Sequence, residues 1–274
     1  MKLTIYHVDA FTNRVFSGNP AAICPLDNWL PDEVMQAIAA ENNLSETAFF
    51  TIDEEHGQGH IRWFTPAFEI NLCGHATLAS SYILFTQLGY TRPSVTFASQ
   101  SGPLVIKREG DFFWMDFPAW IGRSLTAEEL DAVSHALGAT PTQGYATRDW
   151  MVVFNDPAEI LALTPDMTAT AALDCLGVIA TAPGTNDIDF ISRFFAPKCG
   201  GDPEDPVTGS AHSTLIPYWS TRLGKTDMRA RQESKRGGDL LCRYLPSPQG
   251  DTSSRVAMAG QAVTFMRGEI EFDV

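Results

Sequence analysis

The sequence predicts an α+β protein of two related halves, in each of which strands surround a central helix. Segments rich in β-branched and aromatic residues recur along the chain and are separated by Gly and Pro, as is typical of short strands. Two matched blocks of sequence occur in the same order in both halves. Each block leads into a helix-like stretch, and the first, residues 76–85, carries apolar or small residues on nearly every face, as an enclosed helix requires.

The first half is expected to contain one early helix and a series of strands. The helix covers about residues 31–41, because it begins with Pro, continues with acidic residues, and repeats Val34 and Ile38 at helical spacing. The expected strands are residues 3–8, 47–52, 60–64, 94–98, 104–107 and 112–117.

The second half repeats this character after Pro118. A helix is expected at residues 127–137. The expected strands are residues 150–154, 177–182, 189–195, 240–245, 256–259 and 262–266. We therefore predict two lobes, residues 1–118 and 119–274, with the last strand a candidate to return to the first lobe.

The duplication can be followed residue by residue. Arg62–Pro66 corresponds to Arg193–Pro197. Downstream, Glu69–Ala76 corresponds to Glu204–Ala211, with four extra residues before the second Glu. Two matched blocks in the same order indicate an internal repeat, which constrains the fold more strongly than any single motif.

A glycine opens each expected central helix, at about residues 74–88 and 208–223. Gly74 and Gly209 would let the backbone approach a ligand, and the N–H groups of a first helical turn bind negative charge without Lys or Arg. Either glycine alone could merely relieve crowding where a strand meets a helix, but its duplication favours the binding role. Pro217 should kink or shorten the second helix because Pro lacks a backbone donor.

The composition describes a folded, acidic protein. Hydrophobic residues make up 44% and charged residues 19% of the 274 residues, which excludes the composition typical of disorder. A formal charge of -14 would repel a phosphate backbone, so no nucleic-acid partner is expected. An anionic ligand must then be bound by local groups such as helix N-termini.

The cysteines and the N-terminus indicate the compartment. The five cysteines are widely spaced without a C-x-x-C pair, which is typical of reduced thiols. His7 and Asp9 interrupt what would have to be the apolar core of a signal peptide, and no apolar run approaches the roughly 18 residues of a membrane span. We therefore expect a soluble, cytoplasmic protein without a membrane partner.

Glu46 stands just before an expected strand. Asn43 and Glu46 have the spacing of a helix capping box, but residues 47–52 form a strand pattern instead of a helix. The carboxyl group would therefore lie beside apolar residues, where the loss of water suits it to proton transfer. An ordinary surface charge remains open for a lone Glu.

Polar residues also accompany both helix starts. His75 could orient a substrate or share a proton, or it could simply bond to the backbone. Asp205 could do the same, or it could form a turn with Pro206. Ser210 occupies the position of His75 in the second copy.

Several other chemistries lack their motifs. No G-x-G-x-x-G or Walker sequence is present, so no nucleotide cofactor is expected, and the absence of G-x-S-x-G argues against a hydrolase. We expect no metal site, because the potential ligands show no zinc-like spacing. Those potential ligands are Glu46, Cys73, His75, Cys199, Asp205 and His212.

Taken together, a set of motifs resembles the PhzF family of phenazine-biosynthesis-like isomerases. They run in family order over nearly the whole chain, and their combination is specific. They are Val8–Thr12, Phe16–Ala22, Ser45–Phe49, Cys73–Thr77, Glu204–Ala211 and Gly260–Val263.

The resemblance implies the diaminopimelate-epimerase-like fold. In that fold two pseudo-symmetric lobes each wrap a β-barrel-like sheet around a central helix, and the site lies in the cleft between the lobes. The resemblance further implies a homodimer and a cofactor-independent proton shift next to the carboxylate of a small-molecule substrate.

The resemblance also implies roles for individual residues. Glu46 matches the family's proton-shuttling acid and base, and His75 and Asp205 match catalytic polar groups that assist it. The expected substrate-binding residues are Gly74, Gly209 and Ser210.

Two alternatives differ in chemistry. Epimerases of the same fold resemble the chain at the helix starts but place a Cys in both. Cys73 fits one such position and Thr208 fills the other, which disfavours a two-thiol racemase and leaves a one-thiol epimerase or dehydratase possible. The second alternative is a non-catalytic protein that binds a small carboxylate.

Overall fold

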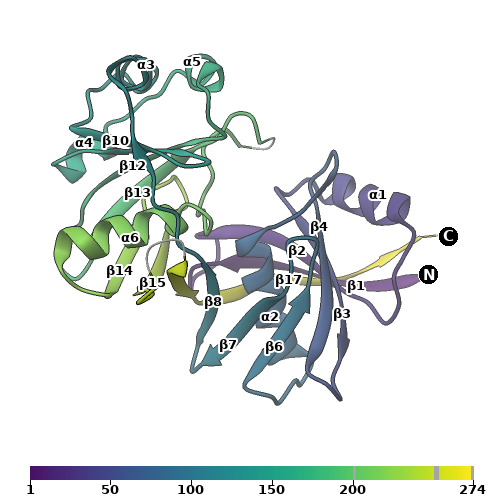
Figure 1. The fold of residues 1–274 in the computed structure, drawn as a ribbon. Helices are drawn as coiled ribbons and strands as arrows, with labels where there is room; N and C mark the ends of the chain where they lie inside the picture. The colour runs from purple at the N-terminus through teal and green to yellow at the C-terminus, as the bar shows by residue number, and fades with distance from the viewer. Residues whose placement is uncertain (200–201, 250–252, 273–274) are drawn as a thin grey trace. The chain divides into compact units, whose positions relative to one another are not determined.

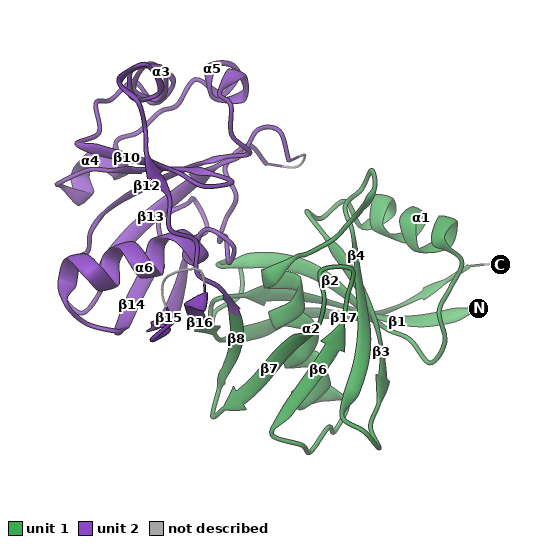
Figure 2. Ribbon diagram, viewed as in Figure 1, with its two compact units in different colours: residues 1–116, 259–274 green, residues 117–258 purple. Residues whose placement is uncertain are grey.

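A computed structural model describes residues 1–199, 202–249 and 253–272 (Figure 1). The chain divides into two compact units (Figure 2): unit 1 consists of residues 1–116 and 259–274, and unit 2 of residues 117–258. The sequence placed the boundary after residue 118, whereas the structure places it after residue 116 and assigns the last strand to unit 1. None of the described helices is both long and apolar enough to span a membrane.

Unit 1 is a sheet wrapped around the helix α2 (Gly74–Gln87) (Figure 1). Neighbouring strands follow the order β17-β1-β2-β3-β4-β6-β7, and α2 contacts β1, β2, β3, β7 and β17. The remaining elements are the short strand β5 beside β4, the strand β8, which pairs with β7, and the helix α1. The bounds are β1 (Lys2–Ala10), β2 (Asn19–Pro25), α1 (Asp32–Asn42), β3 (Thr47–Asp53), β4 (Gln58–Phe64), β5 (Glu69–Ile70), β6 (Ser94–Ala98), β7 (Leu104–Glu109), β8 (Phe112–Pro118) and β17 (Ala262–Glu271).

Unit 2 repeats the strand pairing of unit 1. From β10 to β15 the successive pairings are antiparallel, parallel, antiparallel, parallel and antiparallel, and β1 to β7 show the same alternation when the short β5 is left out. The helix α6 (His212–Leu223) takes the place of α2. The other bounds are β9 (Arg123–Ser124), α3 (Ala127–Leu137), β10 (Gln143–Ala146), β11 (Trp150–Val153), α4 (Pro157–Leu161), α5 (Met167–Ala172), β12 (Val178–Pro183), β13 (Phe190–Phe195), β14 (Asp227–Gln232), β15 (Gly238–Leu245) and β16 (Arg255–Gly260).

The predicted enclosed helix is α2, in which His75 to Ser81 and Ile83 to Phe85 are buried. The hydroxyl groups of its buried Thr and Ser residues donate hydrogen bonds to backbone carbonyl groups at the start of the helix and within it. Thr77, Ser80 and Ser81 each donate to the carbonyl group four residues earlier, at 2.6, 2.7 and 2.9 Å. A helix can therefore be buried on all sides without leaving these donors unpaired.

The duplication extends to matching ion pairs. Arg62 of β4 donates through Nε and Nη2 to the two carboxylate oxygens of Glu69, at 2.8 and 2.7 Å. Arg193 of β13 donates in the same way to Glu204, at 2.7 and 2.9 Å. These are the residues that the sequence alignment of the two halves placed opposite each other. Such two-point pairs fix orientation, so each unit ties its strand to the segment that leads to its central helix.

The second central helix begins at His212, not at residue 208 as predicted. Between Gly209 and Ala211 the backbone forms tight turns, since His212 donates to Gly209 and Ser213 to Ser210, three residues back. Turns of this type are common before a helix and are not distinguished from it by sequence pattern.

Pro217 lies inside α6, and the helix continues to Leu223. Proline cannot donate to the carbonyl oxygen of Ser213, four residues earlier. The backbone N–H of Trp120 donates to that oxygen instead, at 2.8 Å. The helix therefore passes the proline without an unpaired carbonyl group at this position.

Candidate active site

Three chemically active side chains meet inside unit 1. Glu46 immediately precedes β3, Cys73 is the residue before α2, and His75 lies in the first turn of α2. His75 Nε2 is 3.1 Å from Glu46 Oε2, and Cys73 Sγ is 3.5 Å from His75 Nδ1. The side chains of His75 and Glu46 are 7% and 16% exposed. We call these three residues the unit 1 cluster.

The start of each element explains this meeting. β3 pairs in parallel with β2, and the backbone carbonyl of Glu46 accepts a hydrogen bond from Ala22 of β2. α2 packs against both strands. The entrance of β3 and the first turn of α2 therefore lie side by side, although Glu46 and His75 are far apart in sequence.

The three side chains of the unit 1 cluster shift one another's pKa values. Burial lowers the pKa of His75, but its interactions with Cys73 and Glu46 raise it by more, so its pKa lies well above the usual value. Burial raises the pKa of Cys73, and the Glu46 charge adds to this effect. Cys73 is therefore a weak nucleophile near neutral pH.

Oε2 of Glu46 is one of the buried side-chain polar atoms of unit 1 that have no hydrogen-bond partner among the described residues. It is buried and, among the described residues, receives no hydrogen bond of good geometry, although His75 Nε2 lies at 3.1 Å. The contact is electrostatic and not well directed. A buried carboxylate oxygen with an open acceptor position can take a proton from a bound molecule.

The unit 1 cluster also offers a set of metal-ligand atoms. The carboxylate, thiol and imidazole atoms of the three residues lie within 4.8 Å of one another, and in the described part of the chain no other group of this kind is found. These donor types suit zinc, which in structural sites takes four ligands. Three of the six potential ligands named from the sequence therefore meet in space, although their spacing in the chain does not indicate a metal site.

A second cluster of predicted site residues lies in unit 2. The Thr208 hydroxyl donates to the Asp205 carboxylate. Gln232 at the end of β14 donates to the backbone carbonyl of Asp205 and accepts from the backbone N–H of Thr208, both at 2.8 Å. Gln232 is fully buried and holds this loop in place. It was missed by sequence reasoning because it follows Asp205 and Thr208 by more than twenty residues.

Ser210 has a cationic neighbour that was also missed. Arg148 Nη2 donates to the Ser210 hydroxyl at 3.0 Å and to Asp149 at 2.8 Å. Burial raises the pKa of Asp149, and the hydrogen bond and the charge of Arg148 act against this rise. Arg148 therefore supplies positive charge next to a predicted substrate-binding residue in an acidic protein.

Gly74 and Gly209 have different positions relative to their helices. Gly74 is the first residue of α2, as predicted. Gly209 lies three residues before α6, in the turn described above. The expectation that both glycines open a helix is therefore right for Gly74 and wrong for Gly209.

His212, which follows Ser210 by two residues, is buried and neutral. Its Nδ1 lies 2.9 Å from the Thr208 carbonyl, which can only accept, so Nδ1 carries the proton. Nε2 is buried and has no partner among the described residues. Burial lowers the pKa of His212 from 6.5 to about 4.

Between pH 6.5 and 4, His212 is protonated in the unfolded chain but stays neutral in the folded chain. The free energy of unfolding should therefore fall as the pH falls through this window, by roughly 3 kcal/mol from this residue. We expect His212→Gln to show a shallower loss of stability in urea denaturation between these pH values than the unchanged chain. His60→Gln, at an exposed position, is the control. Equal slopes for the unchanged chain and His212→Gln would contradict the assignment.

Comparison with known proteins identifies the family. Residues 8–268 match the family described as phenazine biosynthesis-like protein. An uncharacterised isomerase of Pseudomonas aeruginosa is 47% identical over 270 residues, which cover 98% of this chain and 99% of that protein.

Solved structures agree with this match. A PhzF-family protein of Enterococcus faecalis is 43% identical with a TM-score of 0.91, covering 99% of this chain and 100% of the other. A hydroxyproline epimerase of Agrobacterium vitis shares the fold alone, at 8% identity and a TM-score of 0.61 over 98% of this chain and 92% of the other. The predicted fold class, α+β and diaminopimelate-epimerase-like, is thereby confirmed. The chain belongs to the phenazine biosynthesis-like, or PhzF, family of isomerases and epimerases.

Proposed function

We propose that this isomerase moves a proton between two carbon atoms of a small carboxylic acid without a cofactor, with Glu46 as both acid and base. The observation that carries the proposal is the buried Oε2 of Glu46, which lies 3.1 Å from His75 Nε2 and has no well-directed donor among the described residues. Such an oxygen is available to a proton of the substrate. It also lies next to the imidazole of His75, which can balance its negative charge.

The proposed reaction conserves the composition of the substrate. Glu46 takes a proton from a carbon atom activated by conjugation, and the electron pair of the broken C–H bond delocalises into the conjugated system. The protonated Glu46 then returns a proton to another carbon of the same skeleton. His75, whose pKa is raised by its interactions with Cys73 and Glu46, balances the negative charge of Glu46.

The one-thiol alternative is less well supported. The raised pKa of Cys73 keeps it as a thiol, and Thr208 stands at the equivalent position of the duplication. A two-thiol racemase would need a thiol there. We assign Cys73 to packing beside His75, at 3.5 Å from its ring.

Substrate binding is proposed for Gly74, Gly209 and Ser210, and a catalytic role that assists Glu46 is proposed for Asp205. Arg148 supports the assignment of Ser210, because its guanidinium group donates to the Ser210 hydroxyl at 3.0 Å. A small-molecule carboxylate as substrate and a homodimer as the working form stay predictions.

Incubation in deuterium oxide tests the proposal. We expect the unchanged protein to introduce deuterium at a carbon-bound position of an unsaturated or amino carboxylic acid, as measured by mass spectrometry and NMR over a panel of such acids. Dialysis against a chelator and omission of nucleotides should leave the rate unchanged. Exchange that appears only after a metal, flavin or nicotinamide is added would contradict the proposal, and binding of an acid without exchange would favour the non-catalytic alternative.

A further inference from the structure

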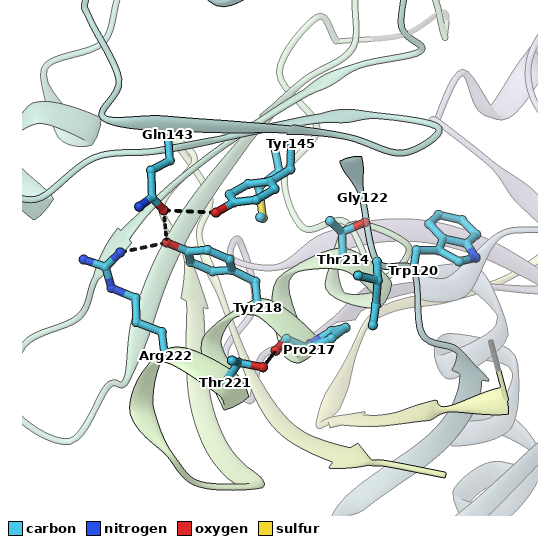
Figure 3. Close-up of a pocket in the computed structure, with 11 residues that line it drawn as sticks. Trp120, Gly122, Gln143, Tyr145, Thr214, Pro217, Tyr218, Thr221 and Arg222 are labelled. Atoms are coloured by element: carbon cyan, nitrogen blue, oxygen red, sulfur yellow. Dashed lines mark hydrogen bonds between the residues drawn. The ribbon is translucent and has the colours of Figure 1, made fainter. Parts of the chain in front are cut away.

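Unit 2 contains a pocket of about 360 Å³ that the proposed reaction does not use (Figure 3). All of its lining residues belong to unit 2, and none of the predicted site residues is among them. Its volume lies at the lower end of the roughly 300–1,000 Å³ typical of small-molecule sites. The pocket is therefore a candidate binding site of its own.

One face of α6 forms a wall of the pocket. Thr214, Pro217, Tyr218 and Thr221 follow one another at helical spacing along this face. The opposite walls come from β10, β11 and the segment 120–122. The hydrogen bond from the Trp120 backbone to Ser213, made possible by Pro217, holds that segment against the helix, so the pocket is built into the fold.

The rings of Tyr145 and Tyr218 and a short polar chain line one side of the pocket, whereas the indole of Trp120 lies apart from them, against Arg148 (Figure 3). Arg222 Nη1 donates to the Tyr218 hydroxyl at 2.8 Å, and this hydroxyl donates to Gln143 Oε1 at 2.9 Å. The Tyr145 hydroxyl donates to the same Gln143 oxygen at 3.2 Å. Burial raises the pKa of Tyr218, although its hydrogen bond to Arg222 and the charge of Arg222 act against this rise, so Tyr218 keeps its proton and can make both bonds.

Arg222 differs in its contacts from several other arginines of the protein. Arg62, Arg148, Arg193 and Arg229 each form an ion pair with a carboxylate. Within the described ranges, Arg222 makes no ion pair, although the protein carries a net charge of -14. A guanidinium group that lines an aromatic pocket without a carboxylate partner is suited to an anion, and it binds planar carboxylates through two parallel donors.

We propose that this pocket binds a planar aromatic carboxylate. The ring contacts the aromatic side chains of Tyr145 and Tyr218, where offset or edge contacts add to the burial of apolar surface. The carboxylate is held by Arg222. The proposal needs no step of the isomerase reaction, so it stands or fails independently of Glu46.

Calorimetric titration with 2-naphthoate tests the proposal, with the neutral 2-naphthamide and the saturated cyclohexanecarboxylate as comparison probes. We expect 2-naphthoate to bind with a Kd below about 1 mM and both comparison probes to bind more weakly. Arg222→Gln should weaken 2-naphthoate binding about tenfold or more, as expected for a hydrogen bond to a charged group, and leave 2-naphthamide unaffected. Tyr218→Phe keeps the ring and should have a smaller effect.

Arg229→Gln is the matched control, since Arg229 is an exposed arginine of unit 2 that pairs with Asp187 outside the pocket. Three results would overturn the proposal. The first is no binding of 2-naphthoate below 1 mM, and the second is binding that Arg222→Gln leaves unchanged but Ser210→Ala removes. The third is a change in sedimentation coefficient with Arg222→Gln, which would assign the pocket to contact between copies of the chain.

Discussion

Glu46→Gln is expected to lower the rate of deuterium transfer from solvent into the substrate by about 100- to 10,000-fold, the usual contribution of a general acid or base. Glutamine keeps the size of the side chain and its position before β3, but its amide group cannot exchange a proton at the required rate. The position of His75 should not change, because α2 is enclosed by its sheet. The loss therefore reports on the proton transfer itself.

Two variants make this result specific. Glu41→Gln removes an exposed carboxyl group in unit 1 and should leave the exchange rate unchanged. Cys73→Ala should keep the rate within about tenfold, since the raised pKa of Cys73 makes it a poor base. Full activity of Glu46→Gln together with an inactive Cys73→Ala would assign the reaction to the thiol and reject the proposed mechanism.

The parts of the fold predicted best were those encoded locally. The helix α3 has the predicted bounds, and its capping box of Thr126 and Glu129 lies within four neighbouring residues. The duplication could be read from contiguous motifs, and the matching ion pairs of Arg62 and Arg193 show that these motifs carry the same structure. At these positions the local sequence preference and the tertiary structure agree, as expected for natural sequences in which local preferences support the global fold.

Among the strands that escaped prediction, β2 and β14 have atypical sequences. β2 (Asn19–Pro25) contains proline at its second and last residues and only one β-branched residue, yet it lies between β1 and β3. β14 (Asp227–Gln232) is mostly polar and pairs between β13 and β15. In both cases pairing with neighbouring strands outweighs the local preference.

The sequence indicated individual residues of the candidate site, but not the distances between them. The sequence named Glu46 and His75, whereas their 3.1 Å contact depends on the packing of α2 against the sheet. Gln232 and Arg148 have no motif of their own. Each acts by holding a residue that lies more than twenty positions away in the chain, and such contacts appear only when the fold is known.

Arg193→Met is expected to lower the free energy of unfolding of unit 2 by about 3 kcal/mol. Besides its two bonds to Glu204, Arg193 donates through Nη1 to the carbonyl groups of Ile160 and Leu163, at 3.0 and 2.9 Å. Methionine fills similar space but removes the arginine donor from the Glu204 carboxylate and from the Leu163 and Ile160 carbonyl groups, of which Ile160 keeps the backbone N–H of Leu163. Loss of one partner of a buried pair costs about 3–5 kcal/mol, and the 23% exposure of Glu204 places the expected loss at the lower end.

Native-state hydrogen exchange, read separately for peptides of the two units, measures this loss. Arg193→Met combined with Glu204→Leu should recover most of it, because the unpaired charge is then absent. If the double variant is as unstable as Arg193→Met, lost packing is the cause and the ion-pair argument fails. Arg62→Met in unit 1 should cost less, about 1–2 kcal/mol, since its Nη1 partner Asp32 is 74% exposed and water can replace the arginine. The Arg–Glu pair through Nε and Nη2 is the same in both units, whereas the contacts of Nη1 differ. The difference in stability loss between Arg193→Met and Arg62→Met therefore measures the contribution of the Nη1 contacts.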